Sequence, residues 1–205
     1  MRTGSVVLPR RVAAQPVPFL HPGGDCGPCV LGGLLGCDVQ SIYASLGKDP
    51  AKDSFAGPEM YDALEKLLSA GAIDRLVTDI PWWVPWKSSS FFGAPAWEIS
   101  LEWFQYVRMA IDAGYYGVAP VVHQKNGPLE CPDHWVLIAG ARVVEEEIIR
   151  EGKRLGATLR TELLISNSST TSPAVPEEWV RVGEFLKHWG GYNLFLVRPS
   201  PVIGP

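Results

Sequence analysis

Apolar residues recur at helical spacing soon after the start of the chain. From Cys26 the sequence reads CGPCVLGGLLG, and Val30, Leu34 and Leu35 suit one face of a helix. Asp25 directly precedes this stretch, in the position where a side-chain oxygen can cap the first free N–H groups of a helix. We therefore predict a helix that begins at Cys26.

Three later stretches also predict helices. The clearest covers residues 58–70, with its inward positions at Met60, Leu64, Leu67 and Leu68. A second covers residues 98–113, with its inward positions at Trp103, Phe104, Val107 and Ile111. The third lies near VGEFLKHWG, close to the end of the chain. The first two are each followed by a glycine, a residue common at helix ends.

The second half of the chain is typical of strands. Short apolar runs rich in β-branched residues occupy residues 118–124, 134–144 and 161–168, and YNLFLVRP forms a fourth run. The charged insert at 145–157 is either a short helix, as the spacing of Glu146 and Arg150 suggests, or the tip of a long hairpin. Because the helices come first and the strands follow, we expect an α+β domain with an antiparallel sheet.

Composition limits the organisation and the partners of the chain. Its 205 residues, 46% apolar and 20% charged, suit one globular domain over 1–205, preceded by an extended arm at 1–24. The net charge of −4 and the lack of a basic run argue against nucleic acid as a partner. The sequence has neither an apolar stretch of about 20 residues nor a signal peptide, so we expect no membrane partner and a cytoplasmic location with reduced thiols.

The four cysteines allow two uses that do not involve a nucleophile. CGPC at residues 26–29 matches the thioredoxin redox motif, but that fold needs a strand directly before the first cysteine, and HPGGD precedes it here. Alternatively, Cys26 and Cys29 could join Cys131 and His134 in a tetrahedral zinc site with three cysteines and one histidine. In that case the chain would be a zinc-stabilised interaction domain.

Nucleophilic catalysis is the third use. A thiol attacks as the thiolate, and both the start of a helix and a neighbouring imidazole lower a thiol pKa. Cys26 occupies the predicted helix start, and His134 opens a predicted strand from which its ring can face that start. The sequence therefore favours Cys26 as nucleophile and His134 as its base.

Three motifs carry a family resemblance. GGDCGPCVLGGLLG, HWVLIAG and LLISNSS resemble the papain-like cysteine peptidase superfamily, in particular the bacterial double-glycine leader peptidases that process bacteriocins. The resemblance implies a papain-like fold in which an N-terminal helical part packs on an antiparallel sheet. It also implies a thiol protease in which Cys26 attacks, His134 is the base and Asn167 orients the imidazole, with a peptide or protein substrate and no metal or other cofactor.

Two parts of the expected site have several candidates. The family places an oxyanion-hole Gln several residues before the cysteine, and here His21 or the more distant Gln15 are the candidates. Trp82, Trp83 and Trp86 lie in a proline-rich loop and form either core or the wall of a substrate groove. The predicted function is a cysteine peptidase or thiol acyltransferase, and a papain-like binding module without activity stays open as an alternative.

Overall fold

A computed structural model describes residues 3–8, 26–53, 55, 57–78, 96–121, 134–167, 177–189 and 194–201. The helices in this part of the chain are α1 (Cys26–Leu35), α2 (Val39–Leu46), α3 (Gly57–Ser69), α4 (Ala96–Asp112) and α5 (Val182–Trp189). The strands are β1 (Gly4–Val7), β2 (Ile73–Val77), β3 (Tyr116–Val121), β4 (His134–Arg150), β5 (Lys153–Asn167), β6 (Glu177–Arg181) and β7 (Phe195–Pro199).

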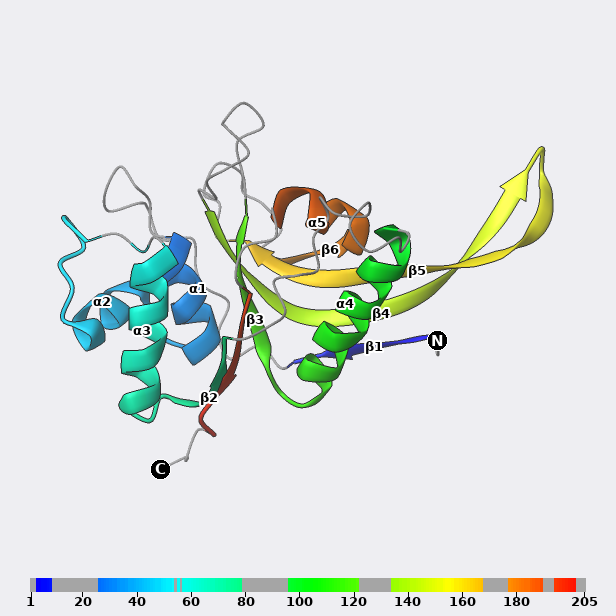
Figure 1. The fold of residues 1–205 in the computed structure, drawn as a ribbon. Coiled ribbons are helices and arrows are strands. Elements are labelled where there is room, and N and C mark those ends of the chain that lie inside the picture. The colour runs from blue at the N-terminus through cyan, green and yellow to red at the C-terminus, as the bar shows by residue number, and fades with distance from the viewer. Residues whose placement is uncertain are drawn as a thin grey trace.

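The strands form one antiparallel sheet, shown in Figure 1. Its order is β2-β7-β3-β4-β5-β6, and β1 pairs with β4 beside this path. Every pairing among the described strands is antiparallel. The expected α+β class with an antiparallel sheet is therefore confirmed.

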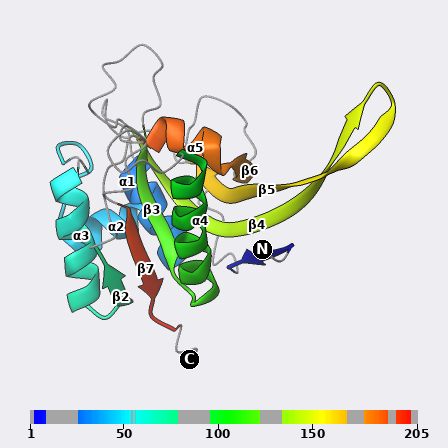
Figure 2. The same ribbon diagram turned by 45° about the vertical axis from the view of Figure 1, so that its right-hand side comes forward.

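Helices cover both faces of this sheet. Alternate residues of β4 divide between two cores because strand side chains alternate in direction. Trp135, Leu137 and Ala139 pack with buried residues of α1, α2 and α3. Val136 and Ile138 pack with buried residues of α4 and α5. Figure 2 shows the α1–α3 group and α4 on opposite sides of the sheet.

The first helical stretch is two helices joined by a sharp turn of 96°. Gly36 adopts a left-handed φ of 74°, and the Asp38 side chain accepts a hydrogen bond from Ser41 N to cap α2. A Cβ at Gly32 would lie 2.7 Å from the Cys37 carbonyl oxygen, so the turn requires glycine at that position. No single helix in the described segments is long and apolar enough to span a membrane, although the bent pair α1–α2 would pass by length and composition together.

The predicted helices at 26, 58–70 and 98–113 and near the C-terminus are confirmed as α1, α3, α4 and α5. The predicted inward direction of Leu68 is wrong, because this side chain is 37% exposed. The buried stripe of α3 consists of Met60, Ala63, Leu64 and Leu67. Leu68 lies at the edge of that stripe, one turn after Leu64, where the helix is about to end.

The charged insert at 145–157 is the tip of a long hairpin and not a helix. Strands β4 and β5 pair from Val136 and Asn167 out to Arg150 and Lys153. Glu146 therefore accepts hydrogen bonds from Arg160 and Arg181 across the sheet. Strand β1 lies inside the predicted extended arm at 1–24, where we expected no strand.

Candidate functional site

Cys26 is the first residue of α1, where the helix contributes a positive electrostatic potential. Its thiol is free of a disulfide and only partly buried, and it packs against the core formed with α1–α3. Cys29, one turn further along, is 3% exposed and belongs to that core. The accessible thiol of the CGPC segment is therefore Cys26.

A close contact at Gly27 connects the start of α1 with Phe55. A Cβ at position 27 would lie 2.5 Å from Phe55 Cβ and 3.2 Å from Met60 Cε, so no side chain fits there without displacement. Phe55 also contacts the edge of the Tyr43 ring, with 5.6 Å between centroids. The residue after Cys26 is consequently held against the segment that precedes α3.

Phe55 in turn contacts the start of β4. The buried indole Nε1 of Trp135 donates a hydrogen bond of 2.6 Å to the Phe55 carbonyl oxygen. Trp135 also stacks on Phe195 of β7 at 6.1 Å. Because Trp135 follows His134 directly, Phe55 joins the first turn of α1 to the first residues of β4, and these two elements pack against each other (Figure 1).

His134 is the first residue of β4 and is 8% exposed. Its backbone pairs with Val121, the last residue of β3. Strand alternation gives His134 the direction of Val136, toward α4 and α5, while Trp135 points toward α1. To react with Cys26, the imidazole of His134 must therefore turn around the N-terminal end of β4.

Asn167 is the last residue of β5, and its backbone lies opposite Val136. Its register position is thus two residues along the sheet from His134. The start of β4 and the end of β5 therefore lie side by side in the sheet.

Cys37 differs from Cys26 in its electrostatic surroundings. Burial raises the pKa of the Cys37 thiol above its ordinary value, and the neighbouring Asp38 carboxylate raises it further. Hydrogen bonds from Ser41 hold the pKa of Asp38 below its ordinary value, so that carboxylate is charged at neutral pH. Cys37 is therefore mostly protonated at neutral pH and is a poor nucleophile.

Several predicted site residues lie outside the described part of the chain. They are the oxyanion candidates His21 and Gln15, the aromatic residues Trp82, Trp83 and Trp86, and the fourth zinc-ligand candidate, Cys131. Among the described residues, no three His, Cys, Asp or Glu side chains gather as a metal-binding group. The described strands also contain no parallel βαβ unit of the kind that a thioredoxin motif requires.

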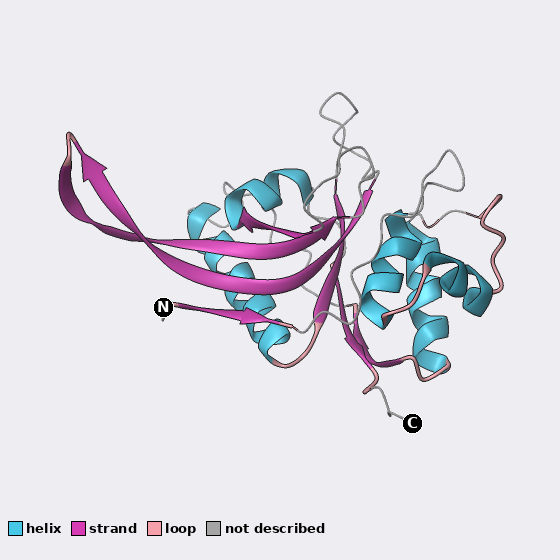
Figure 3. Ribbon diagram, turned by 180° about the vertical axis from the view of Figure 1, so that it is seen from behind, coloured by secondary structure: helices cyan, strands magenta, loops and turns pink. Residues whose placement is uncertain are grey.

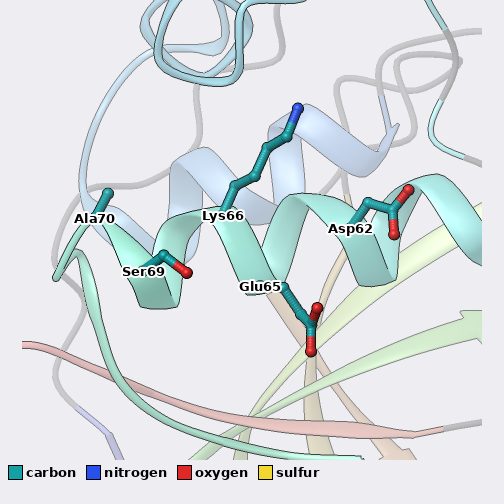
Figure 4. Close-up of a pocket in the computed structure, with 5 residues that line it drawn as sticks. All are labelled: Asp62, Glu65, Lys66, Ser69 and Ala70. Atoms are coloured by element: carbon teal, nitrogen blue, oxygen red, sulfur yellow. The ribbon is translucent and has the colours of Figure 1, made fainter.

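A shallow hollow lies on the outer face of α3 (Figure 4). Its lining consists of Asp62, Glu65, Lys66, Ser69 and Ala70. These residues follow helical spacing on one helix, so the hollow is the solvated side of α3. It contains neither of the predicted catalytic residues.

Comparison with known proteins gives no match, either to protein-family models or to curated proteins. Sequence reasoning missed Phe55 and Gly27 as contributors. One signal was available, since a buried Trp135 indole needs a hydrogen-bond acceptor, but the sequence does not indicate that this acceptor is the Phe55 carbonyl.

Proposed function

We propose that the chain is a papain-like cysteine peptidase, or a related thiol acyltransferase, with Cys26 as nucleophile and His134 as base. The observation that supports it best is the contact of Phe55 with both α1 and β4, which we call the joint at Phe55. That residue contacts Gly27, next to Cys26, and bonds to Trp135, next to His134. The predicted nucleophile and base thus each adjoin a residue held by the same buried contact.

In the proposed reaction His134 takes the proton of Cys26, and the thiolate attacks the carbonyl carbon of a peptide bond. The start of a helix has N–H groups without helical acceptors, and these stabilise the resulting oxyanion. His134 then protonates the leaving amine as the C–N bond breaks and a thioester forms. Water, or an amine in a transferase, attacks the thioester, gives its proton to His134 and releases the acyl product.

Asn167 would orient the imidazole in this reaction. Its place at the end of β5, two register positions from His134, supports that role. The proposal also requires the His134 ring to turn around the N-terminal end of β4 toward α1.

The pH dependence of alkylation tests the proposal, with Cys37 as an internal control. Iodoacetamide labelling of each cysteine would be followed by mass spectrometry in the wild type and in His134→Ala. We expect Cys26 to react at a lower pH than an ordinary thiol, and Cys37 at a higher pH because its pKa is raised. In His134→Ala the labelling curve of Cys26 should move up in pH while that of Cys37 stays in place.

A Cys26 that titrates like an ordinary thiol in both proteins would contradict the ion pair. Turnover is tested separately by trapping a thioester on Cys26 with a peptide library and mass spectrometry. A low pKa without a trapped thioester would indicate a papain-like binding module. Protection of Cys26 that is lost on chelation would instead support the zinc-stabilised domain.

A further inference from the structure

The hairpin of β4 and β5 extends well beyond the rest of the sheet. The pairing of β1 with β4 ends at Gly4 and Val143, and the pairing of β6 with β5 ends at Arg181 and Glu162. The ladder between β4 and β5 continues to Arg150 and Lys153. Residues 144–161, which we call the arm, are therefore a two-stranded ribbon that projects from the body in Figures 1 and 3.

The arm exposes more apolar surface than a solvated ribbon needs. Its exposed apolar side chains are Ile148 at 44%, Ile149 at 64%, Leu155 at 63% and Leu159 at 47%. A two-stranded ribbon alone is marginally stable in water, and an open strand edge invites pairing with another strand. No described strand pairs with either edge of the arm, so a partner strand can add to it.

Charge distinguishes the two edges. The β4 edge carries three acids at 145–147 and then a base at Arg150, whereas the β5 edge from Lys153 to Thr161 contains basic residues and no acid. Antiparallel pairing of two β5 edges would therefore bring together only basic and uncharged residues, with no acid to pair with a base. Pairing of two β4 edges can place Glu146 opposite Arg150 of the copy. Glu146 also accepts hydrogen bonds from Arg160 and Arg181 of its own chain, but its side chain stays 39% exposed.

We propose that the partner is a second copy of this chain, paired antiparallel through β4 to make a ribbon of four strands. The two-fold axis of such a pair is normal to the sheet, so each residue faces one on the same side of the ribbon. The register is fixed by the residue that lies on this axis, which we call the centre and which faces its own copy. A centre at Glu147 would place two carboxylates opposite each other. A centre at Ile149 would place Glu146 opposite Gly152.

A centre at Ile148 makes Ile148 face its own copy, and it alone among these centres places an acid, Glu146, opposite Arg150 of the second copy. Glu145 then lies opposite Glu151, which belongs to the turn after β4. We therefore take Ile148 as the centre.

Cysteine cross-linking tests this register with a matched pair of variants. Directly opposed residues have Cα atoms about 4.5–5.5 Å apart, within the range of a disulfide. Ile148→Cys should therefore give a disulfide-linked dimer on mild oxidation. In Ile149→Cys the two thiols lie on diagonal positions about 7–8 Å apart and should link at least about tenfold more slowly, although Ile149 is the more exposed side chain.

Charge exchange tests the partner. Arg150→Glu opposes carboxylates and Glu146→Lys opposes cations, so each variant alone should dimerise at least about tenfold more weakly in sedimentation velocity. An equimolar mixture of the two should regain dimers, because each edge then meets its complement. Leu155→Lys changes the exposed surface of β5 and should leave the dimer intact, and circular dichroism would confirm that each variant folds.

The proposal does not rest on catalysis at Cys26, and its failure is distinguishable from that of the proposed function. A wild type that remains monomeric up to about millimolar concentration would overturn it. Equal cross-linking of the two cysteine variants would overturn the register. Dissociation by Leu155→Lys would show that the arms meet by their faces instead of their β4 edges.

Discussion

Replacement of Gly27 by alanine tests the joint between α1 and β4. The added Cβ would lie 2.5 Å from Phe55 Cβ and 3.0 Å from Phe55 Cγ, whereas carbon atoms pack best at about 3.5–4.0 Å. Phe55 would have to move by roughly 1 Å. Its carbonyl oxygen is held by the Trp135 indole and its ring by Tyr43, so the displacement would spread to the start of β4.

The size of the effect follows from two opposing contributions. Forcing an extra carbon into a packed core typically costs about 1–3 kcal/mol. Alanine in place of glycine in a helix recovers up to about 1 kcal/mol. We therefore expect Gly27→Ala to lower the free energy of unfolding by about 1–2 kcal/mol, which for a chain of this size is roughly 2–8 °C in Tm.

Gly57→Ala is the matched control, since Gly57 also lies in the first turn of a helix and nothing lies within 4 Å of its Cβ position. Both glycines directly precede a proline, so the steric cost of a Cβ next to that proline is common to the two variants. Gly57→Ala should therefore change the free energy of unfolding by less than about 1 kcal/mol. Urea unfolding at equilibrium would compare both variants with the wild type. If Gly27→Ala matched Gly57→Ala within about 0.5 kcal/mol, the close contact at Phe55 would be refuted as a constraint.

Three further predictions concern polar groups. Trp135→Phe removes the donor to the buried Phe55 carbonyl, so urea unfolding should show a loss of about 1–3 kcal/mol. Glu162→Gln breaks a buried carboxylate's pairs with two partly exposed arginines and should cost about 1–3 kcal/mol, whereas Glu147→Gln, in an exposed pair, should change stability by less than about 0.5 kcal/mol. The pKa of Asp38 is held below its ordinary value of 3.8, so its stabilisation is present above that pH and is lost as the pH falls through the lower folded value. Asp38→Ala should therefore have a lower Tm than the wild type at neutral pH, and the gap should narrow below about pH 4 in a melting series.

The long elements could be predicted from the sequence because their apolar spacing is unambiguous. Helix α4 buries Trp103, Phe104, Val107 and Ile111, which recur at three and four residues as one face of a helix requires. The short strands β1, β2 and β6 could not be predicted. Most of their residues are exposed or half-buried, so no alternation of apolar and polar positions marks them.

The charged insert shows why local pattern was insufficient. Glu146 and Arg150 have the spacing of a helical ion pair, yet the structure places Glu146 beside Arg160 and Arg181 on neighbouring strands. Arg142 and Glu162, 20 residues apart in the sequence, form a close pair in the same way. Register across a sheet decides such contacts, and one strand alone does not contain that information.

The candidate site could likewise be predicted from the sequence only in part. The start of α1 at Cys26 and the start of β4 at His134 followed from residue type and spacing alone. Their connection through Phe55 did not, because a contact between a lone aromatic residue and a glycine 28 positions earlier has no local signature.

Strand β4 carries both proposals, and its length keeps them apart. His134 opens the strand, and Ile148 lies fourteen residues later in the arm. At about 3.3 Å per residue these positions are on the order of 45 Å apart, far beyond the 7–10 Å within which substitutions usually couple. The first half of the strand is buried on both faces, whereas none of the described strands pairs with either edge of the arm. We therefore expect a change in the arm to alter association without affecting the thiol, and a change around Phe55 to alter the thiol without affecting the arm.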